Sequence, residues 1–233
     1  MDINISSHFS DKIYNVVDSS CNIVQRIFVK KYDNNMFNEY RNLLKIKNTT
    51  NIVKTDTKNR IIEKFEGKEL LFDVLKKRNT FSEFETRNII NQLLIIISEL
   101  KVVHSDIKLE NIIYNTVSGQ INLIDFEINS ITESYISPEL INKYKKPDVK
   151  TSLWAVGIIT YVLLFGKYPF ENKKDILCDR IITEEDLDLD ISDNCKKFIT
   201  RCLYKNYTKR INMYNTINHN WFKSEHKNSN VRI

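Results

Sequence analysis

The chain has 233 residues, of which 42% are hydrophobic and 28% are charged, and its formal net charge is +5. Such a chain can bury a sizeable core as one domain or two small lobes, which excludes an intrinsically disordered protein. The net charge is small and no run of five or more lysines and arginines occurs, so we expect no nucleic-acid partner.

Cysteine spacing and apolar stretches bear on the compartment. The four cysteines are Cys21, Cys178, Cys195 and Cys202. None has C-x-x-C spacing, so we expect neither a metal site nor a disulfide framework, and a reducing compartment, the cytoplasm, fits best. The N-terminus shows no signal-peptide pattern, and the longest apolar stretch, 154–165, is shorter than the roughly 20 residues of a membrane span, so no membrane association is expected. The richness in Ile, Asn and Lys is typical of an AT-rich genome, such as that of a large DNA virus or a protist. For a viral protein, the compartment would be the host cytoplasm.

Residues 1–66 predict a small lobe of strands with one helix. Runs rich in β-branched residues indicate strands at 13–17, 23–30, 52–53 and 60–65. Helical spacing of apolar residues predicts a helix at 37–46. One helix among several antiparallel strands is typical of an α+β arrangement.

Residues 67–225 change to a helical pattern, and residues 226–233 read as a polar tail. Helices are expected at 70–77, 82–100, 152–165, 175–182, 193–204 and 213–221. Ser82 and Glu85 form the capping-box pattern that starts a helix. Two short apolar runs after residue 111, joined by a turn at Ser118-Gly119, predict a strand pair.

The polar stretch His104–Asn111 lies between a predicted helix and that strand pair. Asp and Asn oxygens are hard ligands of the kind that Mg²⁺ takes, and Asp125-Phe126 follows the second strand. Asp106 is suited to accept a proton, and Lys108 to neutralise a phosphate oxygen. The spacing H-x-D-x-x-x-x-N followed by D-F is the pattern of the catalytic and metal loops of protein kinases.

With these residues the chain resembles the eukaryotic-type serine/threonine protein kinases over about residues 9–223. Its C-terminal half is most similar to the calcium/calmodulin-dependent and related kinases. The further motifs that carry the resemblance are Leu164–Phe170, Lys209–Ile211, His219–Phe222, and Ser137-Pro138-Glu139 in the place of A-P-E. The resemblance implies an α+β, bilobal protein-kinase-like fold, with a small β-rich N-lobe and a larger helical C-lobe.

The resemblance also implies catalytic roles. Asp106 would orient and deprotonate the substrate hydroxyl, and Lys108 would stabilise the transferring phosphate. Asn111 and Asp125 would hold the metal, Mg²⁺ or Mn²⁺. The rival interpretation makes each an ordinary surface residue, but their joint spacing and apolar flanks would then be a coincidence.

The nucleotide site implied by the resemblance draws on the N-terminal region. Lys30 would contact the α and β phosphates of ATP, with its neighbour Lys31 as the alternative for this role and with Glu39 as the ion-pair partner. Glu63 and Phe65, in a hinge at 63–66, would lie against adenine, with Ile62 as the gatekeeper. The alternatives are an edge-strand charge for Lys30 and a helix-surface acid for Glu39.

Other polar residues have structural interpretations. Glu139 and Arg210 would form a buried pair that ties the larger lobe together. His104 is expected to be a packed, hydrogen-bonded core residue rather than a catalyst. The acids of residues 184–190 indicate a solvated loop, with a docking site for basic peptides as the alternative.

Several positions depart from the family pattern. The glycine-rich loop is missing at residues 6–14, where side chains would hold the backbone amides away from phosphate. Glu127 replaces the glycine of D-F-G, Ser105 the arginine of H-R-D, and Ser152 the aspartate that starts the central helix. The loop between the two motifs, residues 128–136, is short.

Two functions follow from this pattern. The first is an ATP- and metal-dependent kinase of serine and threonine in protein substrates, which is not gated by loop phosphorylation. The second is a binding protein without catalysis, a decoy that engages another kinase or its substrate. The full set of ionic residues favours the first function, because a scaffold has no electrostatic need for several acids in one cleft.

Overall fold

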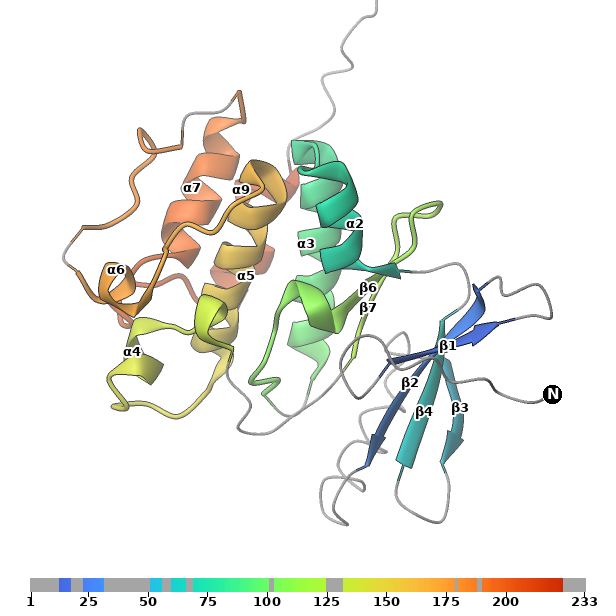
Figure 1. Cartoon of the computed structure of the whole chain (residues 1–233). Coiled ribbons are helices and arrows are strands. Elements are labelled where there is room, and N and C mark those ends of the chain that lie inside the picture. Colours follow the sequence, from blue (N-terminus) through green and yellow to red (C-terminus); the bar gives the residue numbers. More distant parts are fainter. Residues whose placement is uncertain are drawn as a thin grey trace, which may run out of the picture. The chain divides into compact units, whose positions relative to one another are not determined.

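The computed structural model describes residues 69–100, 103–124, 132–178, 180–187 and 190–223, and also the backbone of four strands between residues 13 and 65 (Figure 1). The chain divides into two compact units, Met1–Asn79 with Ile96–Thr132 and Thr80–Ile95 with Glu133–Ile233. Among the described residues, no helix has the length and apolar character needed to span a bilayer.

A four-stranded antiparallel sheet is formed by the N-terminal strands. They are β1 (Ile13–Val17), β2 (Ile23–Lys31), β3 (Asn51–Thr55) and β4 (Arg60–Phe65). Their order is β1-β2-β4-β3, and Lys30 of β2 pairs with Ile61 of β4. All four predicted strands are therefore confirmed, while the predicted helix at 37–46 lies outside the described residues.

A second antiparallel sheet supports the polar loop. It has the order β5-β6-β7, with β5 at Glu69–Leu70, β6 at Ile112–Tyr114 and β7 at Ile121–Leu123. The predicted hairpin turn is confirmed, and Gly119 takes a φ of 71°, a left-handed conformation that glycine adopts freely and that most other residues, asparagine excepted, disfavour. A short 3₁₀ turn, η1 (Leu109–Asn111), leads directly into β6.

The helices α2 (Leu71–Arg78) and α3 (Glu83–Glu99) follow β5. The predicted capping box is present, because the Glu85 amide donates to Ser82 Oγ and the Ser82 amide donates to Glu85 Oε2. The strand β5 was not predicted, because two residues are too few to show an alternating pattern.

The buried central helix is α5 (Val149–Phe165), which begins three residues earlier than predicted. Asp148 is its N-cap, since the Asp148 side chain accepts a hydrogen bond from the Thr151 amide at 3.0 Å. Ser152, in place of the family aspartate, donates to the Asp148 carbonyl at 3.3 Å. Asp148 therefore caps the start of α5, a role that the family pattern gives to an aspartate at position 152.

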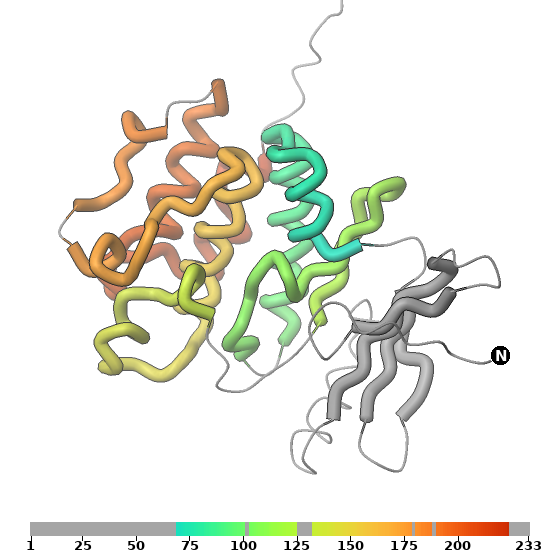
Figure 2. The backbone as a smooth tube through the Cα atoms, in the orientation of Figure 1, coloured from blue at the N-terminus to red at the C-terminus, as the bar shows by residue number. Residues whose placement is uncertain are grey.

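The remaining elements lie around α5, which packs against α7 (Figure 2). They are η2 (Glu133–Tyr135), α4 (Pro138–Ile141), α6 (Lys173–Leu177), α7 (Asp193–Cys202), α8 (Met213–Ile217) and α9 (Asn220–Lys223). The aromatic core between α7 and α9 places the rings of Phe198 and Trp221 4.8 Å apart.

Two helix predictions in this region were wrong in extent. The helix expected at 175–182 ends at Leu177, because the Lys205 ammonium binds the carbonyls of Asp175 and Cys178 at the end of α6. The helix expected at 213–221 is two helices, because His219 Nδ1 accepts the Trp221 amide hydrogen at 3.2 Å and so begins α9 anew.

Candidate active site

His104 anchors the polar loop from inside the protein. It is buried, and its Nδ1 accepts the Asp106 amide hydrogen at 3.2 Å. Nδ1 is therefore unprotonated, and Nε2 carries the hydrogen that it donates to the Ile124 carbonyl at 3.1 Å. This tautomer is inferred from the hydrogen-bond network. His104 fastens the loop to the end of β7, which confirms its structural interpretation.

Asn111 closes the other end of the loop. Its side-chain nitrogen donates to the Asp106 carbonyl at 2.8 Å, and its own carbonyl accepts the Ile124 amide hydrogen at 2.9 Å. With the nitrogen turned toward Asp106, the amide oxygen Oδ1 is the atom left to serve as a hard ligand. The hydrogen bond from Asn111 to Asp106 is possible because the 3₁₀ turn η1 turns the chain back toward the preceding residues of the loop.

The Asp106 carboxylate is the centre of a closed set of hydrogen bonds. Its Oδ2 accepts from the Lys108 ammonium at 2.5 Å. Its Oδ1 accepts from the Thr132 hydroxyl at 2.7 Å and from the Thr132 amide at 3.1 Å. Lys108 also donates to the Thr132 hydroxyl at 2.9 Å. The carboxylate side chain is only 3% exposed, so its charge is neutralised by Lys108 at a nearly dry position.

Thr132 was not among the residues predicted from the sequence. It lies 26 residues after Asp106, and it precedes Ser137-Pro138-Glu139 by five residues. Ser130 and Ser134 are hydroxyl residues in the same short segment. Sequence pattern alone does not say which of the three hydroxyls faces Asp106, and that choice is made by the backbone of the segment.

The predicted site residues are brought together in part. Asp106, Lys108 and Asn111 are joined directly by hydrogen bonds. Asp125 and Glu39 lie outside the described residues, so their places in the site stay predictions.

Four other predicted residues lie on strands of the N-terminal sheet whose backbone alone is described. Lys30 is on β2, and Ile62, Glu63 and Phe65 are on β4, which pairs with it. In this register Val29 stands opposite Ile62. Their predicted contacts with nucleotide therefore stay predictions.

The predicted buried pair is confirmed. The Arg210 guanidinium donates two hydrogen bonds to the Glu139 carboxylate, at 2.5 and 2.8 Å, and both side chains are fully buried. Arg210 also donates to the carbonyls of Tyr204 and Lys150 and lies over the Trp154 ring, 5.0 Å from its centre. This buried, hydrogen-bonded pair has a structural role.

Comparison with known proteins finds several relatives that are named as protein kinases. The chain is 35% identical over 174 residues to serine/threonine-protein kinase 1 of Heliothis zea nuclear polyhedrosis virus, an alignment that covers 63% of this chain and 62% of the relative. It is 32% identical over 196 residues to calcium-dependent protein kinase 5 of Plasmodium falciparum, covering 74% of this chain and 34% of the relative.

Death-associated protein kinase 2 of Mus musculus is 32% identical over 185 residues, which cover 69% of this chain and 50% of the relative. The chain thus spans less than two thirds of the length of each of these relatives. The resemblance noted from the motifs, to serine/threonine kinases and to the calcium/calmodulin-dependent group, is confirmed. The protein kinase domain family matches residues 21–222, so the chain belongs to the protein kinase family.

Proposed function

We propose that the protein transfers a phosphoryl group from ATP to serine and threonine hydroxyls of protein substrates. The observation that carries this proposal is the Asp106 carboxylate, which Lys108 and Thr132 hold in one orientation. Catalysis of phosphoryl transfer depends mainly on positioning and charge stabilisation, and a buried, oriented carboxylate beside an ammonium supplies both.

The chemistry assigns a role to each residue of the set. As the substrate hydroxyl oxygen bonds to the γ-phosphorus of ATP, the bond from that phosphorus to the β-phosphate oxygen breaks and ADP leaves, while Asp106 accepts the hydroxyl proton. Lys108 then offers its charge to the transferring phosphoryl group. No enzyme nucleophile is needed, so no covalent intermediate forms on the protein.

The protein kinase family uses ATP with a divalent metal. Asn111 fits this requirement, because its nitrogen is held by the Asp106 carbonyl and its oxygen is left as a ligand. We assign Asn111 and Asp125 to Mg²⁺ or Mn²⁺, which would neutralise phosphate charge when bound. We assign Lys30 with Glu39 to the phosphates, and Ile62, Glu63 and Phe65 to the adenine.

Two sequence features support the proposal that loop phosphorylation does not gate the enzyme. Ser105 stands where the family has the arginine that pairs with a phosphorylated loop. The loop at 128–136, which would carry that phosphate, is short for the family. The missing glycines near residues 6–14 suggest weaker binding of nucleotide than is usual in the family.

The test is a transfer assay with the purified chain, labelled ATP, Mg²⁺ or Mn²⁺ and a generic basic protein substrate. We expect label transfer that Asp106→Asn abolishes and that Asp193→Asn, an exposed acid on α7, leaves intact. Transfer that survives Asp106→Asn would contradict the assigned base. The binding-protein alternative predicts no transfer and no metal-dependent rise of the melting temperature with nucleotide.

A further inference from the structure

The end of α6 brings a cysteine and a lysine together from distant parts of the chain. Cys178 is the first residue after α6, and its amide donates to the Lys174 carbonyl at 2.8 Å. Lys205 follows α7, 27 residues later in the chain, and its Nζ lies 3.6 Å from Cys178 Sγ. The nitrogen and the sulfur are therefore at contact distance, within the unit that contains α5 and α7.

The lysine is held in this place by further contacts. Its ammonium donates to the carbonyls of Asp175 and Cys178, each at 2.8 Å. It also lies over the Phe170 ring, 5.2 Å from the ring centre. Because groups other than the sulfur fix the position of Nζ, the long lysine side chain would lose little further freedom in a reaction with that sulfur.

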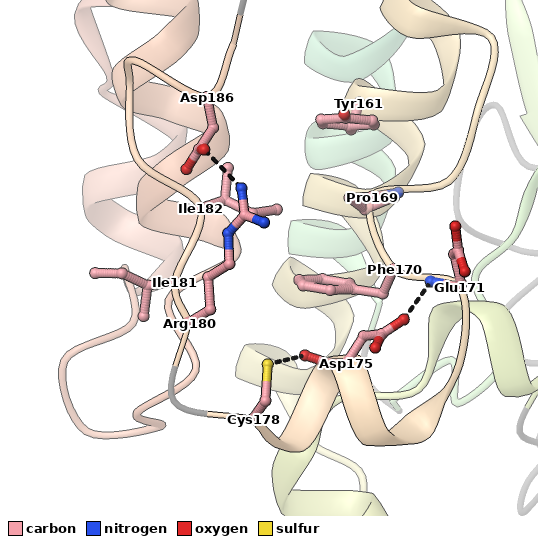
Figure 3. A pocket seen from close by; sticks show the side chains of 10 residues that line it. All are labelled: Tyr161, Pro169, Phe170, Glu171, Asp175, Cys178, Arg180, Ile181, Ile182 and Asp186. Carbon is pink, nitrogen blue, oxygen red and sulfur yellow. Dashed lines mark hydrogen bonds and ion pairs between the residues drawn. The ribbon is translucent and has the colours of Figure 1, made fainter.

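The thiol is held by one of the same carbonyls. Cys178 Sγ donates to the Asp175 carbonyl at 3.0 Å, a bond that Figure 3 draws as a dashed line. One carbonyl oxygen thus accepts hydrogens from both Sγ and the Lys205 ammonium, and so keeps the two atoms side by side. Two reactive atoms held in contact need little rearrangement to form a bond.

Cys178 can meet an oxidant that is dissolved in water. It is exposed, and Figure 3 shows it in the wall of a pocket with Asp175 and Phe170. Cys195 and Cys202 are instead buried, and burial raises the pKa of both thiols. Among the cysteines that the structure describes, Cys178 is therefore the one open to attack by a peroxide.

We propose that Cys178 and Lys205 are the site of a covalent cross-link that forms when the protein meets a peroxide. In the first step the sulfur attacks hydrogen peroxide, the O–O bond breaks, and a sulfenic acid and water result. The Lys205 ammonium then gives one proton to solvent, and its nitrogen attacks the sulfenic sulfur. The S–N bond forms as the S–O bond breaks, and the hydroxyl leaves as water with a second proton from the nitrogen. The sulfur is oxidised by two electrons, and the peroxide is reduced.

The cross-link would tie the end of α6 to the segment that follows α7. It would close the chain between residues 178 and 205, much as a disulfide closes a loop. Thiols would reverse it, because two of them are oxidised to a disulfide as the S–N bond is cleaved and both side chains are restored. This reversible response to oxidants does not depend on the proposed kinase function.

The test treats the full chain with hydrogen peroxide in a Cys21→Ser background, which removes another cysteine that could pair with an oxidised Cys178. After alkylation of the remaining thiols and digestion, mass spectrometry should find the peptides of Cys178 and Lys205 joined, with a mass two hydrogen atoms below their sum. Dithiothreitol should separate them. A joined pair that keeps one more oxygen atom would also support the cross-link at these residues. Peptides that stay separate would overturn the proposal.

A matched variant tests the role of the lysine nitrogen. Lys205→Arg keeps the charge and the hydrogen-bond donors, but a guanidinium does not lose its proton in proteins and cannot attack the sulfur. Without the cross-link, Cys178 should be oxidised further, so we expect severalfold more sulfinic acid at this residue than in the parent protein. Lys209→Arg, an exposed lysine of the same segment, should leave the cross-link unchanged. Equal sulfinic acid in the parent and in Lys205→Arg would overturn the proposal.

Discussion

The Asp106 carboxylate is oriented by donors on both of its oxygens. Lys108 is two residues away in the same loop, but Thr132 comes from a separate segment and holds Oδ1 through both its hydroxyl and its amide. A general base must be held within a fraction of an ångström of its productive position, so in the proposed reaction Thr132 would be a positioning residue for Asp106.

We expect Thr132→Val to lower kcat by about 10- to 100-fold, because the isosteric side chain removes the hydroxyl that fixes Asp106 and Lys108. Thr132→Ser, which keeps the hydroxyl, should retain most of the activity. Initial rates at saturating ATP and substrate give the comparison. A valine variant as active as the serine variant would show that the hydroxyl does not position the base.

At this scale the sequence predicted that Asp106, Lys108 and Asn111 lie together, but it did not predict all of their hydrogen-bond partners. The spacing of Asp106, Lys108 and Asn111 in one loop is local, so motif pattern could bring them together. Thr132 could not be found in the same way, because its contact depends on a backbone path that pattern does not specify. The buried pair of Glu139 and Arg210 was predictable only through the resemblance, since 71 residues separate them.

Individual helices are fixed by contacts at their ends and by positions where two helices come unusually close to each other. Gly157 in α5 is such an approach, since a Cβ added there would lie 2.7 Å from Cys202 Cβ and 2.9 Å from Leu203 Cδ2. Helix patterns locate α5 from its apolar residues, but they do not show that α7 comes this close. The premature end of α6 has a similar cause, because Lys205 is distant in the chain.

We predict that Gly157→Ala destabilises the protein by about 1–3 kcal/mol, through overpacking between α5 and α7 that outweighs the higher helix propensity of alanine. Chemical unfolding monitored by fluorescence measures the change. Gly119→Asn is the control, because that glycine has open space and a positive φ that asparagine tolerates, so its effect should be small. Unchanged stability of Gly157→Ala would show that the contact between α5 and the end of α7 can rearrange to accommodate the added methyl group.

The start of α3 is joined to α7 and α9 through Glu83. Its carboxylate accepts from the Ser192 amide at 2.7 Å, the Ser192 hydroxyl at 2.6 Å and the Trp221 indole at 2.8 Å. Burial raises the pKa of the Glu83 carboxyl, but these hydrogen bonds and the charge of Arg87 outweigh burial and lower it below its ordinary value of 4.5.

A pKa that is lower in the folded protein means that ionised Glu83 adds stability above pH 4.5, and that this stability is lost as the pH falls through the folded value. We therefore expect Glu83→Gln to lower the free energy of unfolding near neutral pH by about 1–2 kcal/mol, with a difference that shrinks in acid. Urea unfolding across this pH range tests it, with Glu99→Gln as the control. A constant difference at all pH values would contradict the assignment.

At the scale of the whole molecule, resemblance to a family predicts contacts between distant segments that local apolar spacing cannot predict. Apolar spacing predicts strands and helices, and these predictions were accurate for the four N-terminal strands, α3 and α5 within a few residues. The contacts that link distant segments, such as Arg210 with Glu139, Tyr204 and Lys150, are set by tertiary packing and leave no local periodicity in the sequence. The bounds of α6 and the division between α8 and α9 could not be predicted from the sequence and were seen only in the structure.

At this scale we predict that Glu139→Ala destabilises the protein by about 3–5 kcal/mol, because it leaves the Arg210 charge buried without its partner. Lys173→Met is the matched control, since it breaks the exposed pair of Lys173 and Glu133, and should change stability by less than about 1 kcal/mol. Denaturant midpoints measure both. A loss for Glu139→Ala no larger than that of the control would show that the buried pair is dispensable.

The buried Glu139–Arg210 pair also constrains when the chain can fold during its own synthesis. Glu139 leaves the ribosome 71 residues before Arg210, so for that interval a folded nascent chain would have to bury an anion with no counter-charge. Domains generally fold as units during translation. We therefore expect the α4–α5 region to complete its folding only after Arg210 has also left the ribosome and can pair with Glu139.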